Sequence, residues 1–458
     1  MIGDLKPHAS YKNSGQDWIG SIPAHWSLLR AKRLFREVDE RSKTGKEELL
    51  SVSHLTGVTP RRLKTVTMFM AESNVGHKVC RPGDLVINTL WAWMAALGVT
   101  RHTGLVSPAY GVYRPIDGGG ILPAYADHLL RTPLYAAEYQ RRSTGVNSSR
   151  LRLYPEQFLR VQVLVPPLKD QAAIVRYLDW ANGRLEQATR AKRKVIALLT
   201  EQKQAIIQRA VICGTDPGAA RKSTDIAHLG DVPKSWEIRR LKSLVTNVIE
   251  QTATKTADEI YIALEHVQSW TGRVNLQRGQ DEDLFAGTVK RFRKEDVLFG
   301  KLRPYLAKVI TAPSSGVCVG EFFVLRPNHS LITSLFLEQL LRTVAVIRAI
   351  DSSTFGAKMP RADWQFVGNL RVALPVIHEQ LAIVENVQRE TVPLAKAISR
   401  REHEIALLHE YRTRLVADVV TGRFDVREAA ARLPAEAERA IDEELIDDVE
   451  LADEETEA

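Results

Sequence analysis

A long stretch with a coiled-coil pattern runs from residue 166 to 214. It opens with Pro166-Pro167, contains no further proline and ends at Gly214, which is how a helix usually begins and ends. At ~1.5 Å per residue such a helix is roughly 70 Å long, so it cannot be enclosed by one small domain. Its apolar positions recur at alternating steps of four and three residues and predict an interface with a second helix. They include Ile174, Leu178, Leu185, Val195, Leu199 and Ile206.

The second helix is predicted in the same chain, over residues 375–425. This stretch opens as the first one does, because a glutamine follows the proline by five residues at both Pro166 and Pro375. Two seams of similar length favour an intramolecular, antiparallel helix pair. A kink is expected at Pro393. The second seam comprises Val384, Leu394, Ile398, Ile405, Leu408 and Leu415.

The duplication extends into the residues that precede each helix. A Gly-x-x-Pro-x-x-Trp segment ends at Trp26 and again at Trp236, at an offset of 210 residues. Later matches keep a similar offset: Arg81-Pro82-Gly83-Asp84 with Arg293-Lys294-Glu295-Asp296, and Arg114-Pro115 with Arg326-Pro327. A unit of about 160 residues followed by a long helix therefore occurs twice, a period too long for a solenoid.

Short β-branched and aromatic runs alternate with turns in each repeat, and a helical stretch follows them. The predicted fold class is α+β, with two similar mixed domains joined by two long antiparallel coiled-coil helices in a pseudo-two-fold arrangement. The expected segments are domain 1 (1–165), the central helix (166–214), domain 2 (215–374), the C-terminal helix (375–425) and an acidic, disordered tail (426–458).

The charge of the chain is unevenly distributed. The formal net charge is +8, but residues 428–458 hold 13 acidic residues against two arginines and contribute −11, so the rest carries +19. A basic body of this kind favours a polyanionic partner, with nucleic acid first. A solvated basic surface remains the alternative.

Several other classes of protein are not expected. No apolar run approaches the ~20 residues of a membrane span, and residues 1–6 lack the order of a signal peptide. Cys80, Cys213 and Cys318 are dispersed, which favours a reducing, cytoplasmic location without a zinc cluster. The chain has no P-loop, no G-x-G-x-x-G, no H-E-x-x-H and no Asn/Asp-Pro-Pro-Tyr/Phe of an amino-methyltransferase. We therefore expect no catalytic residues, no metal site and a binding role.

Cationic and aromatic residues cluster between the predicted strands and again just before each long helix. Arg and Lys can read guanine edges or hold phosphates. The alternatives are ordinary charged loops and, for the tryptophans, core positions. The candidate DNA contacts are Trp91, Trp93, Arg101, Asn147, Ser148 and Arg150 in the first repeat, and Lys301, Arg303, Tyr305, Lys308, Lys358 and Arg361 in the second.

The framework of the two repeats is shared, whereas the contents of these loops differ. The first repeat has Asn88-Thr89-Leu90-Trp91 where the second has Gly300-Lys301-Leu302-Arg303. This contrast predicts two recognition modules of one architecture that read two different half-sites, with the stiff helix pair fixing the distance between them.

With these residues in view, the chain resembles the specificity subunits of type I restriction–modification systems. The resemblance is carried by the Trp-containing repeat openings, by the Asp-containing strand that leads into Gly300-Lys301-Leu302-Arg303-Pro304, and by the helix openings 166–174 and 375–383. It covers nearly everything up to about residue 425. The acidic tail has no counterpart in the family pattern.

The resemblance implies two target recognition domains, each binding half of a bipartite, gapped site in double-stranded DNA. It implies that the helices dock two modification subunits, which bring S-adenosylmethionine and methylate a flipped-out adenine. Restriction subunits that use ATP and Mg²⁺ would join them, and this chain itself would bind no cofactor. Two alternatives stay open: a duplicated coiled-coil scaffold, and the specificity partner of a different gapped-site restriction enzyme.

Overall fold

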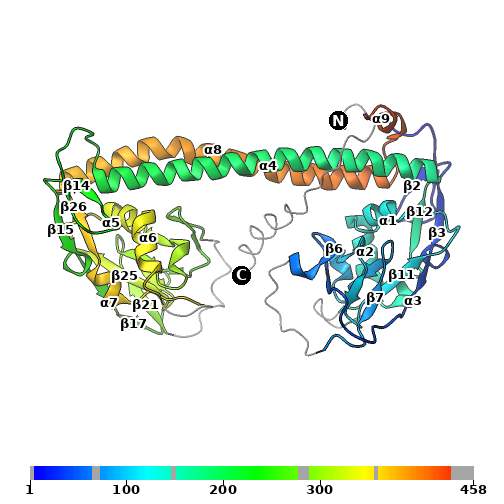
Figure 1. Cartoon of the computed structure of the whole chain (residues 1–458), viewed down its shortest axis with the longest axis horizontal. Helices are drawn as coiled ribbons and strands as arrows, with labels where there is room; N and C mark the ends of the chain where they lie inside the picture. The colour runs from blue at the N-terminus through cyan, green and yellow to red at the C-terminus, as the bar shows by residue number, and fades with distance from the viewer. Residues whose placement is uncertain (1–4, 64–72, 146–150, 277–287, 355–358, 435–458) are drawn as a thin grey trace. The chain divides into compact units, whose positions relative to one another are not determined.

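The structure, a computed structural model, describes residues 5–63, 73–145, 151–276, 288–354 and 359–434. The chain forms two compact units. Unit 1 comprises Met1–Arg190 with Glu404–Ala458, and unit 2 comprises Ala191–His403. The two long helices are α4 (Leu168–Cys213) and α8 (Ile377–Val420). Each of them has one half in unit 1 and the other half in unit 2 (Figure 1). The units thus divide the chain within the helices, whereas the expected segments divided it at the helix ends.

Both long helices begin next to a buried glutamine that fixes the preceding chain. In α4, Gln171 accepts the N–H of Leu122 (2.7 Å) and donates to the carbonyl oxygens of Gly120 and Pro166 (2.7 and 2.8 Å). In α8, Gln380 makes the equivalent three hydrogen bonds. A buried amide needs its partners satisfied, which explains why this residue is duplicated. The helices end before glycines with positive φ, and α8 runs through Pro393 without a break.

The central sheet of unit 1 has the strand order β4-β11-β8-β9, with antiparallel neighbours throughout. Strands β3 and β12 form a separate antiparallel pair that leads into α4. The strands are β1 (Tyr11–Asn13), β2 (Ser21–Pro23), β3 (Ser27–Arg30), β4 (Phe35–Glu37), β5 (Leu50–Ser53), β6 (Gly57–Pro60), β7 (Lys78–Cys80), β8 (Leu85–Ile87), β9 (Leu97–Val99), β10 (Gly104–Val106), β11 (Gly111–Pro115) and β12 (Gln162–Val165). The shorter helices are α1 (Pro123–Leu130), α2 (Pro133–Arg142) and α3 (Pro155–Phe158).

The central sheet of unit 2 repeats this order as β16-β25-β22-β23, and the pair β15–β26 leads into α8. A second sheet, β17-β21-β24-β18, contains one parallel pair, β18–β24. The strands are β13 (Arg221–Ser223), β14 (Asp231–Pro233), β15 (Glu237–Arg240), β16 (Val245–Val248), β17 (Gln251–Thr252), β18 (Ile260–Ile262), β19 (Val267–Gln268), β20 (Arg273–Val274), β21 (Val289–Phe292), β22 (Val297–Gly300), β23 (Val309–Thr311), β24 (Gly316–Cys318), β25 (Phe322–Pro327) and β26 (Arg371–Leu374). The shorter helices are α5 (Ser334–Leu341), α6 (Val344–Asp351), α7 (Trp364–Asn369) and, in unit 1, α9 (Arg427–Ala431).

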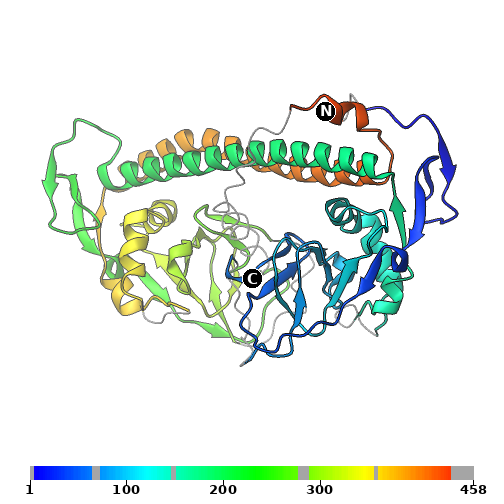
Figure 2. The same ribbon diagram turned by 45° about the vertical axis from the view of Figure 1, so that its right-hand side comes forward.

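The long helices pack in an antiparallel manner within each unit (Figures 1 and 2). In the core of unit 1, Leu178 near the start of α4 lies in one cluster with Leu415 near the end of α8. In unit 2, Val211 near the end of α4 lies with Val387 near the start of α8. The same clusters contain the buried Trp26 and Trp236, so in each unit the halves of the long helices share a core with part of the sheets. A second apolar cluster lies within the sheets of each unit. The predicted fold class is confirmed.

One predicted seam residue is wrong. Val195 is 41% exposed, whereas the neighbouring Ile196 is half-buried and Thr189 is buried. Two successive steps of four, from Ala181 through Leu185 to Thr189, shift the inward face by one residue relative to a strict heptad. Among the other predicted positions, Ile174, Leu178, Leu185, Val384 and Leu415 are buried, and Leu199, Ile206, Leu394, Ile398, Ile405 and Leu408 are half-buried.

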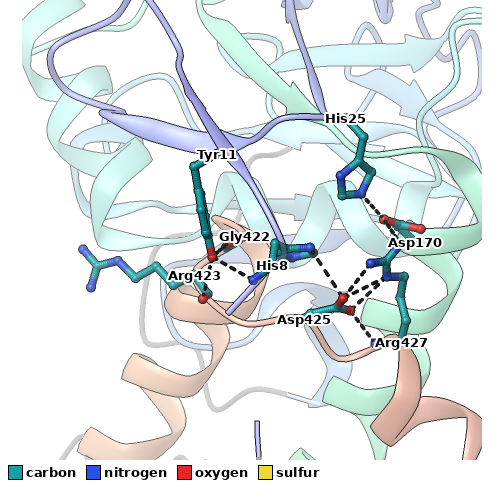
Figure 3. Close-up of polar contacts among 8 residues, drawn as sticks. All are labelled: His8, Tyr11, His25, Asp170, Gly422, Arg423, Asp425 and Arg427. Atoms are coloured by element: carbon teal, nitrogen blue, oxygen red, sulfur yellow. Dashed lines mark hydrogen bonds and ion pairs between the residues drawn. The ribbon is translucent and has the colours of Figure 1, made fainter. Parts of the chain in front are cut away.

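The end of α8 is tied to the start of the chain within unit 1 (Figure 3). The Tyr11 hydroxyl lies 3.2 and 3.1 Å from the carbonyl oxygens of Gly422 and Arg423. The Arg427 guanidinium binds Asp425 at 2.6 Å and lies 3.8 Å from Asp170, which also binds His25 at 2.8 Å. In unit 2 the chain runs directly from α4 into β13, so these contacts replace a covalent connection.

The acidic tail does not start where the sequence predicted. Residues expected to be disordered from 426 onward include α9, and Val426 and Ala430 are 1% and 2% exposed in the core of unit 1. Arg176 of α4 holds the end of this segment by a hydrogen bond to the carbonyl oxygen of Leu433 (2.8 Å). Side chains four residues apart lie on one face of a helix, so Val426 and Ala430 both reach the core. Residues 435–458 lie outside the described part of the chain.

Candidate nucleic-acid interface

In unit 2 the candidate loop follows strand β22, which is buried along its whole length. The loop turns through the short 3₁₀ helix Pro304–Leu306, flanked by Arg303 (φ +50) and Ala307 (φ +48). Left-handed backbone at a residue with a side chain costs roughly 1–2 kcal/mol, and such strain is concentrated at functional sites. Tyr305 is 44% exposed, and Lys301 and Arg303 are half-buried.

The segment before α8 lies directly against this loop. The backbone N–H of Arg303 donates to the carbonyl oxygen of Pro360, and that of Ala362 donates to Lys301, both at 2.8 Å. Leu302 and Arg361 form a β-bridge. The two stretches that the sequence singled out separately are therefore one site. Lys358 lies outside the described residues.

Two charged side chains of this site were missed by the sequence reasoning. The Lys290 ammonium donates to the carbonyl oxygen of Phe322 (2.7 Å), and its pKa is lowered by burial and by the positive charge of Lys301. Glu321 accepts a hydrogen bond from the Arg361 guanidinium at 3.1 Å. Both residues come from elsewhere in the chain and carry no local motif. Lys308 is held by the carbonyl oxygen of Leu264 at 2.9 Å, so its ammonium supports the loop.

The corresponding loop of unit 1 presents aromatic rings. Trp91 and Trp93 are stacked, with ring centroids 6.2 Å apart and planes inclined by 18°. Trp91 is 50% exposed, which excludes a core position, and Trp93 is half-buried. The N–H of Leu153 donates to the carbonyl oxygen of Thr89 at 3.0 Å and joins this loop to the segment before α4, as in unit 2. Asn147, Ser148 and Arg150 lie outside the described residues.

Arg101 does not belong to this site. It follows strand β9, which runs antiparallel to β8 and pairs Val99 with Leu85. Because β9 reverses the direction of the chain, Arg101 lies at the opposite end of the hairpin from the loop with Trp91. Sequence proximity was misleading here, since eight residues after the loop the chain has already returned along the sheet.

A buried ion pair fixes the start of the strand that leads into the loop in each unit. Asp84, 2% exposed at its side chain, receives two hydrogen bonds from Arg114 at 2.8 and 2.7 Å. Asp296 receives two from Arg326 at 2.9 and 2.7 Å. These bonds raise the pKa of both arginines. They connect the turn before β8 or β22 to the central strand β11 or β25, so the sheet positions the loop.

The side chains at the two loops are groups that can recognise a ligand. Among the described residues, no group of three His, Cys, Asp or Glu side chains is placed to hold a metal ion. Burial raises the pKa of Cys80 and of Cys318 to about 12, which disfavours the nucleophilic thiolate. No helix in the described parts of the chain is long and apolar enough to span a membrane. What the site presents is guanidinium, ammonium and phenol groups in unit 2 and indole rings in unit 1.

Comparison with known proteins points to one family. No protein-family model matches the chain. The specificity subunit of the type I restriction enzyme EcoDI of Escherichia coli is 20% identical over 245 residues, which cover 50% of this chain and 54% of the relative. The chain thus spans about half the length of the curated relative that it matches.

One solved structure shares the fold over a longer range. A chain from a type I restriction–modification system, determined in a study of complex assembly and conformational transition, has a TM-score of 0.56 at 16% identity and covers 87% of this chain and 98% of its own length. The HsdS subunit of Thermoanaerobacter tengcongensis aligns over 88% and 98% at 16% identity with a TM-score of 0.40. In sequence this chain is similar to the specificity subunit of EcoDI, and in fold it is similar to a chain of a type I restriction–modification system.

Proposed function

We propose that the chain is the non-catalytic DNA-recognition subunit of a type I restriction–modification complex. Each unit reads one half of a bipartite, gapped site in double-stranded DNA. The observation that carries the proposal is the duplicated site with divergent chemistry. The same loop, tied to the same pre-helix segment, carries Lys301, Arg303 and Tyr305 in unit 2 and the pair Trp91–Trp93 in unit 1.

The two loops suit different base edges. A guanidinium such as that of Arg303 can bind the O6 and N7 of guanine together, a contact worth ~1–3 kcal/mol of discrimination. An exposed indole such as Trp91 offers an apolar face to the methyl group of thymine. The shared sheet behind the loops would give both units the same approach to the DNA, while the side chains at the loop would select the sequence.

The remaining partners belong to the same proposal. Two modification subunits would dock on the helices and bring S-adenosylmethionine, and restriction subunits would bring ATP and Mg²⁺. Exposed apolar residues on the unit 2 halves of the helices support docking there: Val195 (41%), Leu198 (56%), Leu381 (53%) and Val392 (48%). Val195 and Leu198 lie one turn apart on α4, and adjoining exposed apolar side chains are typical of a protein interface. The continuous helices would set the gap between the half-sites.

The backbone at Arg303 allows a sharp test. Glycine adopts φ +50 without strain, so Arg303→Gly removes the guanidinium while it preserves or relaxes the loop. Ala307→Gly is the matched control, because Ala307 has φ +48 in the same loop but is 1% exposed and cannot touch DNA. We expect Arg303→Gly to relax the sequence preference at one half-site and Ala307→Gly to leave it unchanged. Methylation by the assembled complex, measured on DNA with all four bases at each position, reads out both. Identical preferences in the two variants would refute the role of this loop.

A further inference from the structure

Three exposed cations in unit 1 surround an open cavity of about 740 Å³. Arg30 ends strand β3, Lys32 lies in the following 3₁₀ helix, and Arg160 follows α3. None of the three side chains makes a hydrogen bond or an ion pair with any residue that the structure describes. Other arginines of unit 1 are paired, since Arg62 and Arg81 bind glutamates at 2.7 and 2.6 Å.

The lining of the cavity leaves an excess of positive charge. Arg142 also lines it and is bound to the buried Glu138 at 2.6 Å. Glu156 is the single carboxylate among the lining residues. Like charges that share a cavity repel one another unless an anion lies between them. The cavity is therefore complementary to an anionic ligand.

Unit 2 repeats two of these cations at the equivalent strand pair, with Arg240 for Arg30 and Lys242 for Lys32, and adds Arg371. Arg240 ends β15 and stands directly opposite Arg371 of β26, and Lys242 lies in the following 3₁₀ helix. All three are exposed, and the described residues provide no ion-pair partner for them. Like charges directly opposite on antiparallel strands destabilise the pair. In unit 1 Arg30 stands opposite the neutral Gln162, so this repulsion belongs to unit 2, and a bound anion would compensate for it there.

The cations lie next to the candidate nucleic-acid interface in each unit. In unit 1 the cavity is lined by Arg142 and Glu156, which flank in sequence the segment bridged at Thr144 and Arg152. In unit 2, Lys242 packs against α7, where a Cβ built on Gly368 would lie 3.4 Å from the Cβ of Lys242. Helix α7 directly follows the segment that contacts the Arg303 loop.

We propose that these cations form a phosphate-binding site in each unit, Arg30–Lys32–Arg160 in unit 1 and Arg240–Lys242–Arg371 in unit 2. The ligand is the DNA backbone beside the half-site, so the inference rests on the proposed function. The Arg–Lys pair that the two sites share fits this ligand, because phosphate is the same at every sequence whereas base edges differ. The cations position the duplex, and the divergent loops read it.

The test compares variants with equal changes of charge in the full chain. Arg30→Gln/Lys32→Gln removes two cations of the site, and Arg33→Gln/Arg36→Gln removes two exposed cations that do not line the cavity. Binding is measured from low to high salt, on a duplex with the recognised site and on a scrambled duplex. The slope of log K against log salt is negative, and each lost phosphate contact reduces its magnitude by about 0.9. We expect a slope reduced by about 2 for the site variant on both duplexes, with the ratio between them kept, and a wild-type slope for the control.

Unit 2 adds a readout that a structural role would not give. Arg240→Gln/Arg371→Gln removes a cross-strand repulsion, so we expect unchanged or higher thermal stability together with a lower salt slope. A wild-type slope in both site variants would overturn the inference while leaving sequence recognition intact. If those variants instead fail to retain the modification subunits, the surface binds an acidic protein and the phosphate assignment is wrong. A wild-type chain without any preference between the two duplexes would contradict the proposed function itself.

Discussion

The duplicated ion pair at the start of β8 and of β22 leads to a prediction with a definite order. Removing Arg326 leaves the Asp296 carboxylate, 3% exposed at its side chain, with the backbone N–H of Arg293 as its remaining hydrogen bond at 2.8 Å. Asp296→Asn leaves Arg326, whose side chain is 30% exposed and can turn towards water. The two substitutions break the same ion pair. Removing Arg326 leaves a buried carboxylate without its partner, whereas Asp296→Asn leaves a partly exposed guanidinium without one.

The loss of unfolding free energy depends on which charged group is left without its partner. A buried charge that loses its partner costs about 3–5 kcal/mol of unfolding free energy. A partly exposed guanidinium that loses a carboxylate is rehydrated, and an amide still accepts the backbone hydrogen bond, so Asp296→Asn costs about 1–3 kcal/mol. We therefore expect Arg326→Met to destabilise unit 2 by about 2 kcal/mol more than Asp296→Asn.

Denaturant unfolding of the purified chain measures this difference. The two units can unfold in separate transitions. The matched variants of unit 1, Arg114→Met and Asp84→Asn, show which transition belongs to which unit, because the Arg114–Asp84 ion pair has nearly the same geometry as the pair in unit 2. The reasoning predicts the same order in both units. If the arginine variants are no less stable than the asparagine variants, the burial of the carboxylate does not control the energetics and the reasoning fails.

Three further predictions concern the helices and their ends. Gly422→Ala should destabilise the chain more than Gly214→Ala, because both have positive φ but the new Cβ would lie 2.5 Å from a proline carbon in the first case and at least 3.3 Å from any neighbour in the second; chemical denaturation distinguishes them. The hydrogen bond from a neighbouring arginine lowers the pKa of Asp425 below its ordinary 3.8, so its stabilising contribution is present above that pH and is lost on acidification. Thermal midpoints of wild type and Asp425→Asn should therefore differ at neutral pH and converge in acid. Leu178→Ala should lower the free energy of unfolding by about 2–5 kcal/mol, and Val195→Ala should lower it by less than about 0.5 kcal/mol. Equal losses would show that Val195 packs in the helix interface, as the strict heptad predicted.

The duplication made most of the fold predictable from the sequence. Matching Asp84 with Asp296 and Arg114 with Arg326 anticipated equivalent positions, and the structure joins them in equivalent ion pairs. The long helices were predictable because the residues at which they begin and end, and the spacing of their apolar residues, are local properties of the chain. The loops around Trp91 and Lys301 were found for the same reason, as differences within a repeated frame.

What could not be predicted depends on contacts between distant segments. The exposure of Val195 results from a shift in the inward face of α4 that only the packed partner reveals. Lys290 enters the site from another strand, and Arg101 leaves it because β9 reverses direction. Residues 426–434 read as part of an acidic tail, since anchoring by two apolar residues gives too weak a signal in so charged a context.

The central claim is that two duplicated units read the two halves of one gapped DNA site. Mapping methylated adenines across the genome of cells with and without this gene tests it most directly. The account predicts that one bipartite motif, with two dissimilar halves separated by a fixed gap, is methylated only when the gene is present, and that Arg303→Gly changes one half alone. Methylation that is the same in both strains, or a single continuous motif, would contradict it.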